Sequence, residues 1–167
     1  WPRMPFDPRY VEHVLSENFE DAKVFLSPLL AIHQAHLVML AEQGIVGAAD
    51  ARALRDALDA IRHGDVRRCG YDAACEDLFF HVERLLTDAC GADAAGRLNT
   101  ARSRNDVDMT MYRMRLRELV LALADAALRL RDGLVDLADR HRETLFAAHT
   151  HTQPAQPTTM AHYLLAV

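Results

Sequence analysis

The stretch that decides the fold is NDVDMTMYRMRLRELVLALADAALRLRDGLVDLADRHR, residues 105–142. Apolar side chains recur in it in alternating steps of three and four, over about four heptads. They form a seam of Met109, Tyr112, Leu116, Leu119, Leu123, Ala126 and Leu130, and Gly133 and Leu137 continue its register. This spacing predicts one helix of roughly 50 Å, at about 1.5 Å per residue. Such a length is typical of an extended bundle, shared between subunits.

Shorter apolar patterns predict three helices before this one. Ser27-Pro28 begins the first, because Ser caps free N–H groups and Pro fits the first helical position, and Gly44 ends it. The second covers about residues 49–63 and the third about 74–90. Residues 65–73 are predicted to be a polar connector.

The two ends of the chain give weaker signals. Residues 1–20 predict no element, and 148–157 predict a loop because Pro154 and Pro157 break any helix. A last helix is predicted from about Thr158. Since no strand alternation is convincing, the predicted fold class is all-α.

Composition narrows the class of protein. The chain has 167 residues, half of them hydrophobic, which excludes a disordered tail. The 24 acidic and 19 basic residues argue against a general nucleic-acid binder. No apolar run approaches the ~20 residues that span a bilayer, and the nearest, 119–130, contains Asp125.

The cysteines and the chain ends complete the general expectations. The number of cysteines is odd and their spacing is wide, which predicts free thiols in a cytoplasmic protein at Cys69, Cys75 and Cys90. The first residues lack the apolar core of a signal peptide. Because the chain begins without Met and stops inside a predicted helix, we expect it to be the N-terminal portion of a longer protein.

Two short segments carry the groups suited to chemistry. In the first, Arg102 and Arg104 can each grip a carboxylate, and Ser103 and Asn105 add neutral donors at the start of the long helix. These four residues are therefore candidates for binding a small dicarboxylate. The alternative is that Ser103, Asn105 or Asp106 only caps the helix while both arginines are solvated.

The second segment is Thr150-His151-Thr152-Gln153, in the proline-bounded loop. Imidazole suits proton transfer near neutral pH, so His151 is the candidate general acid–base. Alternatively His151 is an ordinary surface residue, or it joins His149 and His162 around a metal. No Asp, Glu or Cys flanks these histidines, so no metal is predicted.

His33 and His36 lie on an otherwise apolar predicted helix. We expect them to be buried or half-buried structural residues rather than ligands.

Three ordered motifs resemble the argininosuccinate lyase branch of the fumarase/aspartase superfamily. That family carries Gly-Arg-Ser-Arg-Asn-Asp-Gln, matched here by residues 101–107 with Ala and Val at the ends. It carries Thr-His-Leu-Gln-x-Ala-Gln-Pro, matched by 150–157 with Thr152 for Leu. It also carries Glu-Asp-Ile-His-x-x-x-Glu, matched by 76–83. The resemblance covers most of the chain from about Lys23.

The resemblance implies a C–N lyase that eliminates an amine from an N-succinyl substrate and releases fumarate, without a metal or cofactor. Argininosuccinate, as in arginine biosynthesis, is the default substrate. Ser103, Arg104 and Asn105 would hold the succinyl carboxylates with help from Thr150. His151 would act in proton transfer, and Gln153 would support the loop.

The resemblance also implies an architecture. Residues 1–98 would form a small N-terminal helical domain, and 99–167 would begin the central bundle of a cytoplasmic homotetramer. Active sites would be built from three subunits. The family's catalytic serine lies on a Gly-Ser-Ser-x-Met-Pro-x-Lys-x-Asn loop, which nothing in these residues matches, so we expect this chain alone to be inactive.

Three positions depart from the family pattern. Phe79 replaces the His of the third motif, His33 stands where a Ser usually binds substrate, and Leu29 stands where Asp is common. These changes put arginine as the leaving amine in doubt. The alternatives are a related lyase for another N-succinyl amine or amino acid, or a non-catalytic homologue of the lens-crystallin kind.

Overall fold

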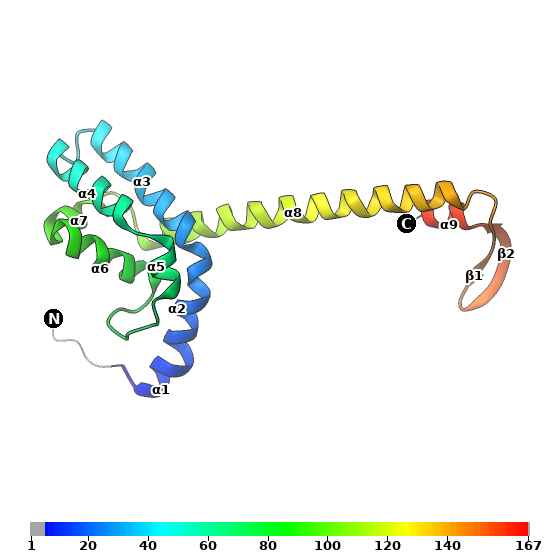
Figure 1. Cartoon of the computed structure of the whole chain (residues 1–167), viewed down its shortest axis with the longest axis horizontal. Helices are drawn as coiled ribbons and strands as arrows, with labels where there is room; N and C mark the ends of the chain where they lie inside the picture. Colours follow the sequence, from blue (N-terminus) through cyan, green and yellow to red (C-terminus); the bar gives the residue numbers. More distant parts are fainter. Residues whose placement is uncertain (1–5, 167) are drawn as a thin grey trace. The chain divides into compact units, whose positions relative to one another are not determined.

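A computed structural model describes residues 6–166 and divides the chain into two compact units. The first unit ends at Arg115 and the second begins at Leu116, inside the long helix α8 (Arg104–Arg140) that Figure 1 shows. The long helix predicted over residues 105–142 is therefore present. The predicted domain boundary between residues 98 and 99 stays a prediction.

The first unit is helical almost from its start. The sequence predicted no element over residues 1–20, and for the described part this was wrong, because helix begins at Pro8. A π turn and a 3₁₀ turn interrupt the usual period of 3.6 residues and hide the pattern. The consecutive segments are α1 (Pro8–Tyr10), η1 (Val11–Leu15), α2 (Ser16–Ala22), η2 (Lys23–Phe25) and α3 (Leu26–Glu42).

This helical run, Pro8–Glu42, is long and apolar enough to cross a membrane by length and composition, so the expectation that residues 119–130 come nearest to a span is wrong. In the folded unit Leu26, Leu29 and Leu40 are buried within the hydrophobic cluster. We therefore assign the run to the core of the unit.

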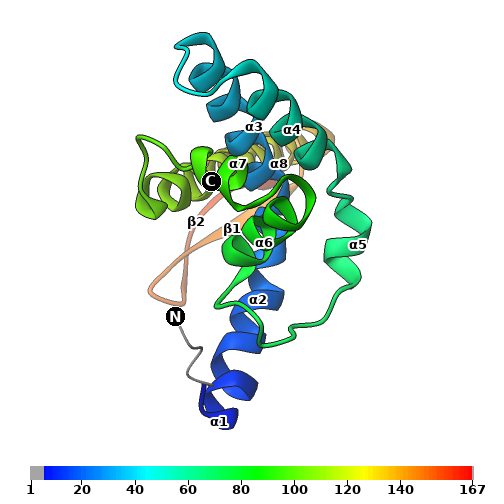
Figure 2. The same ribbon diagram turned by 90° about the vertical axis from the view of Figure 1, so that its left-hand side faces the viewer.

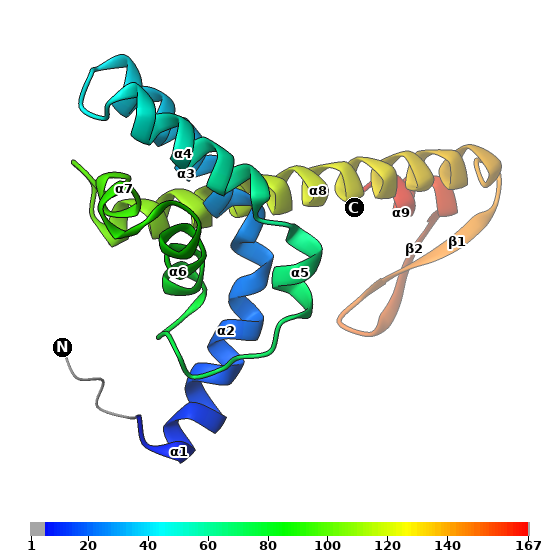
Figure 3. The ribbon, with the colours of Figure 1, turned by 60° about the vertical axis from the view of Figure 1, so that its left-hand side comes forward.

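Four shorter helices complete the first unit. They are α4 (Ala48–Ala60), α5 (His63–Arg68), α6 (Leu78–Cys90) and α7 (Ala92–Arg97). The helix α4 contacts α3, α6 and α7, and Figures 2 and 3 show α3 and α4 as an antiparallel pair. The predicted connector 65–73 was partly wrong, because α5 covers its first residues.

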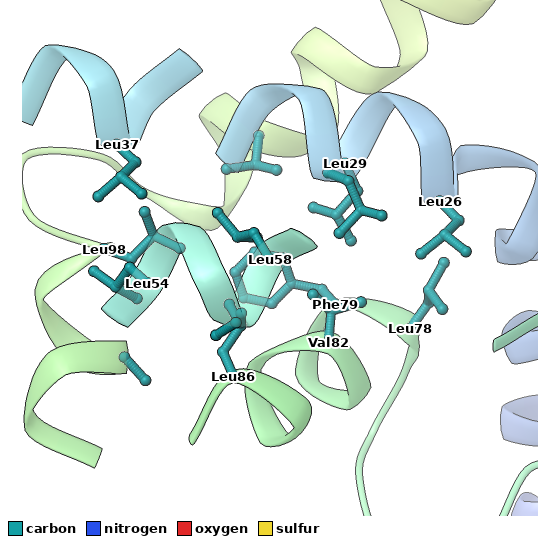
Figure 4. Packing of buried hydrophobic residues seen from close by; sticks show 14 of the residues in the cluster. Leu26, Leu29, Leu37, Leu54, Leu58, Leu78, Phe79, Val82, Leu86 and Leu98 are labelled. Atoms are coloured by element: carbon teal, nitrogen blue, oxygen red, sulfur yellow. The ribbon is translucent and has the colours of Figure 1, made fainter. Parts of the chain in front are cut away.

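The core of this unit is made where these helices meet (Figure 4). Leu26 and Leu29 of α3, Leu54 and Leu58 of α4 and Val82 of α6 are all buried members of this cluster. Figure 4 shows Leu26 beside Leu78 of α6, and Leu54 beside Leu98. Burial of a leucine stabilises the fold by about 1.5–3 kcal/mol. The core thus fixes α3 and α6, the two helices that carry His33 and Phe79.

The second unit contains the rest of α8, a β-hairpin and α9 (Met160–Leu165). The hairpin pairs β1 (Leu145–Thr150) with β2 (Gln153–Thr159) in antiparallel register. The predicted loop over residues 148–157 was therefore wrong. Pro154 and Pro157 hid the second strand, although proline is tolerated at the edge of a sheet.

The mainly helical class is confirmed, with the hairpin as the one sheet of the described residues. The seam of α8 is exposed from Leu116 through Leu119, Leu123 and Leu130. An exposed apolar stripe of this length is typical of a helix that packs against others in an assembly.

Candidate functional site

Arg104 is fixed by two carboxylates at the start of α8. Its Nη2 donates to Asp77 Oδ2 over 2.6 Å, and its Nε donates to Asp108 Oδ1 over 3.0 Å. Burial lowers the pKa of Arg104, but the bonds to Asp77 and Asp108 outweigh burial and raise it. The guanidinium is therefore a permanent and well-oriented cation.

Aromatic rings form the floor under this cation. The Arg104 guanidinium lies 4.6 Å from the ring centre of Phe79 and 5.5 Å from that of Phe80, within the range of a cation–π interaction. Arg104 and Phe79 line a cavity of about 430 Å³, together with Asp108 and Tyr112. A volume of this order matches the small-molecule sites of proteins.

Ser103 and Asn105 stand exposed beside Arg104. The backbone N–H of Ser103 donates to Asp106 Oδ2 over 2.8 Å, so Asp106 caps the helix by reaching back from its third position. Ala101, just before them, has a φ of +62°, which turns the chain sharply into α8. The capping alternative thus falls to Asp106, and the side chains of Ser103 and Asn105 face solvent.

Arg102 points the other way, into the fold. Its Nη2 lies 2.7 Å from His33 Nδ1 and donates to Asn99 Oδ1 over 2.9 Å. The Asn99 amide in turn donates to Glu83 Oε1. Burial lowers the pKa of Arg102, and the nearby Glu83 carboxylate partly opposes this shift.

His33 is fully buried, as expected of a structural histidine, and His36 is half-buried. Burial and, second, the charge of Arg102 lower the pKa of His33 to about 3, with a smaller contribution from His36. The neutral ring therefore accepts from Arg102. His36 Nε2 lies 2.9 Å from the carbonyl oxygen of Thr100 and ties α3 to the loop before α8.

In the second unit, His151 occupies the turn of the hairpin. His151 and Thr152 have φ of +49° and +64°, so two residues that are not glycine take the left-handed region in a two-residue turn. Thr150 Oγ1 lies 3.0 Å from His151 Nδ1, and the Thr152 hydroxyl donates to the His151 carbonyl over 2.6 Å. The ring is exposed, with its Nδ1 oriented by Thr150.

The structure thus groups the predicted residues in two sets, one in each unit. Arg102, Ser103, Arg104 and Asn105 lie in the first, and Thr150, His151 and Gln153 lie in the second. Sequence reasoning missed Asp77, Asn99 and Asp108, which accept from the arginines, and Glu83, which accepts from Asn99. The spacing of four between Arg104 and Asp108 is a signal that could have found one of them.

The histidines of the hairpin do not gather around a metal position. Within residues 6–166, the His, Cys, Asp and Glu side chains form no group of three that could hold a metal ion. Cys69, Cys75 and Cys90 are all recorded as thiols rather than disulfides.

Comparison with known proteins identifies relatives of this chain. A family model described as Lyase matches residues 11–167. The chain is 44% identical over 162 residues to argininosuccinate lyase 2 of Agrobacterium fabrum, covering 96% of the chain and 32% of that protein. It is 44% identical over 152 residues to argininosuccinate lyase of Natronomonas pharaonis, covering 90% and 30%. The chain therefore spans about a third of the length of these relatives.

Solved structures of two lyases are similar to the structure of this chain. A variant of EDDS lyase with bound fumarate matches with a TM-score of 0.70 at 30% identity, covering 96% of this chain and 31% of that one. A fumarate lyase from Mesorhizobium sp. BNC1 matches with a TM-score of 0.69 at 20% identity, covering 99% and 38%. The second likeness bears on the fold alone.

Proposed function

The chain belongs to this lyase family, with the argininosuccinate lyases of the fumarase/aspartase superfamily as relatives, and from that premise we propose the activity of the full-length protein. It is a C–N lyase that releases fumarate from an N-succinyl substrate, with argininosuccinate, giving arginine and fumarate, as the default. The observation that carries this proposal is Arg104, held by Asp77 and Asp108 at an open cavity beside the exposed Ser103 and Asn105.

The reaction removes a proton from the carbon next to a carboxylate and breaks the bond to the amine nitrogen. The proton passes to the base and the electron pair of the C–H bond becomes the new C=C bond. The nitrogen leaves with the pair of the C–N bond and gains a proton to give the amine. Negative charge builds on the carboxylate between these steps, so donors placed in advance lower the barrier. Ser103, Arg104 and Asn105 are the donors of this chain.

The hairpin residues complete the assignment. Thr150 helps to bind the succinyl group and Gln153 supports the loop. His151 takes part in proton transfer, with its ring oriented by Thr150. No step requires a metal or cofactor. The serine expected as the base lies outside these 167 residues, so chain 1–167 alone is expected to show no turnover.

The identity of the leaving amine is a separate point. Phe79 and His33 differ from the argininosuccinate lyase pattern, and they lie in contact, with ring centres 5.9 Å apart. Because Phe79 also lines the cavity, a less polar amine or amino acid is the second candidate for the leaving group.

We also propose an assembly and a location for the full-length protein. The exposed seam of α8 supports a homotetramer with shared active sites. The thiols of the three cysteines fit a cytoplasmic protein. A net charge of −5 fits a small-molecule enzyme with neither nucleic acid nor membrane as its partner.

The role of His151 is tested by His151→Asn in the full-length protein. We expect the rate of fumarate release to fall by about 100-fold, within the usual range for a lost proton-transfer group. His149→Asn is the matched control, because His149 lies in the same hairpin and its Nδ1 lies 2.8 Å from the Ala147 carbonyl oxygen. Equal rates for His151→Asn and wild type would remove His151 from the mechanism.

A substrate panel tests the leaving group. Argininosuccinate and a set of N-succinyl amino acids and amines are each supplied to the wild-type protein, and fumarate is measured. Fastest turnover of argininosuccinate supports the default and makes Phe79 and His33 tolerated changes. Faster turnover of a less polar substrate supports the second candidate.

A further inference from the structure

The two arginines of the 102–104 segment differ in how their charges are balanced. Arg104 lies between the carboxylates of Asp77 and Asp108, so this group of three carries a net negative charge. Arg102 bonds to an imidazole and a carboxamide, both neutral. Of the two, Arg102 is the one whose positive charge is not cancelled by a direct ion pair.

Part of the Arg102 guanidinium is also buried. Its Nε and Nη1 are buried and have no hydrogen-bond partner among the described residues. The Glu83 carboxylate accepts from the Asn99 amide, and its charge also acts on Arg102, but the two side chains form no direct ion pair among the described contacts. In a medium of low polarity, the field of such a cation reaches further than it would in water.

The partner of Arg102 is built to stay neutral. His33 has 0% of its surface exposed, and its Nδ1 must accept from Arg102, which places the ring proton on Nε2. The imidazole lies against Phe79 with the two rings tilted by 44°, and Nε2 has no partner among the described residues. A carboxylate in the same place would hold Arg102 equally well but would cancel its charge.

We propose that Arg102 supplies to the dicarboxylate site a positive charge that is not held in a direct ion pair, and that His33 is the positioning residue that holds this arginine without neutralising it. Neither side chain touches the substrate, and this role replaces a direct contact of Arg102 with it. The inference rests on the proposed function, because it concerns the dicarboxylate that Ser103 and Asn105 bind. It assigns to the departure at residue 33 a function that a serine hydroxyl does not supply.

The test uses two substitutions that differ only in charge. In His33→Asn the carboxamide oxygen takes the place of Nδ1 as a neutral acceptor, and in His33→Asp a carboxylate oxygen of the same reach does so. Fumarate itself is the probe, and its Kd is measured by calorimetry on the full-length protein, with Tm as the check of folding.

We expect His33→Asp to weaken fumarate binding by about tenfold or more, since an added buried negative charge opposes a dianion. In the conservative variant His33→Asn, the Kd for fumarate should stay within about threefold of the wild-type value. Equal Kd values for His33→Asn and His33→Asp would overturn the proposal, whether both variants bind as wild type or both are weakened.

Arg102→Gln provides a second measurement that stays informative if His33→Asp does not fold. It should weaken fumarate binding by about tenfold, whereas Arg97→Gln should leave it unchanged. Arg97 is the matched control because it lies in the same unit and pairs with Asp50 on the surface. Equal losses in the two arginine variants would overturn the proposal.

The same data separate the two proposals. If wild-type protein neither binds fumarate nor releases it from any N-succinyl substrate, the proposed function fails and this inference fails with it. If wild type binds fumarate and the charge of residue 33 has no effect, only the inference fails.

Discussion

Asp77 uses its two carboxylate oxygens for different partners. Oδ1 accepts from the backbone N–H groups of Phe79 and Phe80 and so caps α6, while Oδ2 accepts from Arg104. The residue that starts the helix therefore also orients the cation at the cavity. The short-range capping signal is visible in the sequence, but the bond to Arg104, 27 positions away, depends on the tertiary fold.

Substitution of Asp77 by Asn separates these two tasks. Asn also caps helices, so the free energy of unfolding should fall by less than about 1 kcal/mol. The charged partner of Arg104 is lost, and kcat/KM for fumarate release should fall by about tenfold or more.

The control is Asp72→Asn, because Asp72 likewise accepts from a backbone N–H, that of Ala74, and from a guanidinium, that of Arg84. This pair does not line the cavity. Should both variants lose the same activity, the orientation of Arg104 by Asp77 would have no special role.

The buried His33 makes a prediction about pH. Its pKa is about 3 in the fold against 6.5 ordinarily, so in the unfolded chain it gains a proton that the native state refuses. The stability that this provides is complete above pH 6.5 and is lost as pH falls toward 3. Between pH 7.5 and 5.5 the free energy of unfolding should fall by about 1.4 kcal/mol from this residue.

Urea denaturation at the two pH values measures this loss, with His33→Asn as the reference, since Asn does not titrate. Burial also lowers the pKa of His81, which therefore contributes with the same sign in both proteins. The difference between the two isolates His33. An identical pH dependence in wild type and His33→Asn would contradict the buried neutral imidazole.

At the scale of the element, α8 and the hairpin show what a sequence can and cannot reveal. The heptad spacing predicted α8 to within two residues at each end, because one periodic signal runs through it. The hairpin escaped because its turn, His151-Thr152, has none of the glycine or asparagine that marks a two-residue turn. The sequence identified the arginines of the site, whereas the partner Asp77 depends on a contact between elements and Asp108 lies one turn further along α8.

The hairpin turn carries backbone strain that one glycine should relieve. Thr152 has a φ of +64°, which glycine adopts without cost, so Thr152→Gly should raise the free energy of unfolding of the second unit by about 0.5–1 kcal/mol. Hydrogen exchange of the amides of β1 is the measurement.

The control is Thr158→Gly, in the extended strand β2, which should have the opposite effect. Faster exchange in Thr152→Gly than in wild type would show that the bond from its hydroxyl to the His151 carbonyl outweighs the strain.

At the scale of the whole molecule, the apolar seam of α8 makes assembly the central expectation. Leu123 lies in the seam with 70% of its surface exposed in this chain. Leu123→Glu should place a charge in the interface between helices and convert the full-length protein from a tetramer to smaller species in sedimentation analysis.

Arg131→Glu, off the seam, is the control for charge, since Arg131 pairs only with the neighbouring Asp132. An unchanged sedimentation coefficient in Leu123→Glu would show that the seam does not join subunits.

Release of fumarate from an N-succinyl substrate can be measured directly. Full-length wild-type protein is mixed with argininosuccinate, and then with each compound of the N-succinyl panel, while the ultraviolet absorbance of fumarate is followed. We expect the absorbance to rise with at least one of these substrates, and we expect His151→Asn to slow the rise. A folded protein that releases no fumarate from any of them would contradict this expectation.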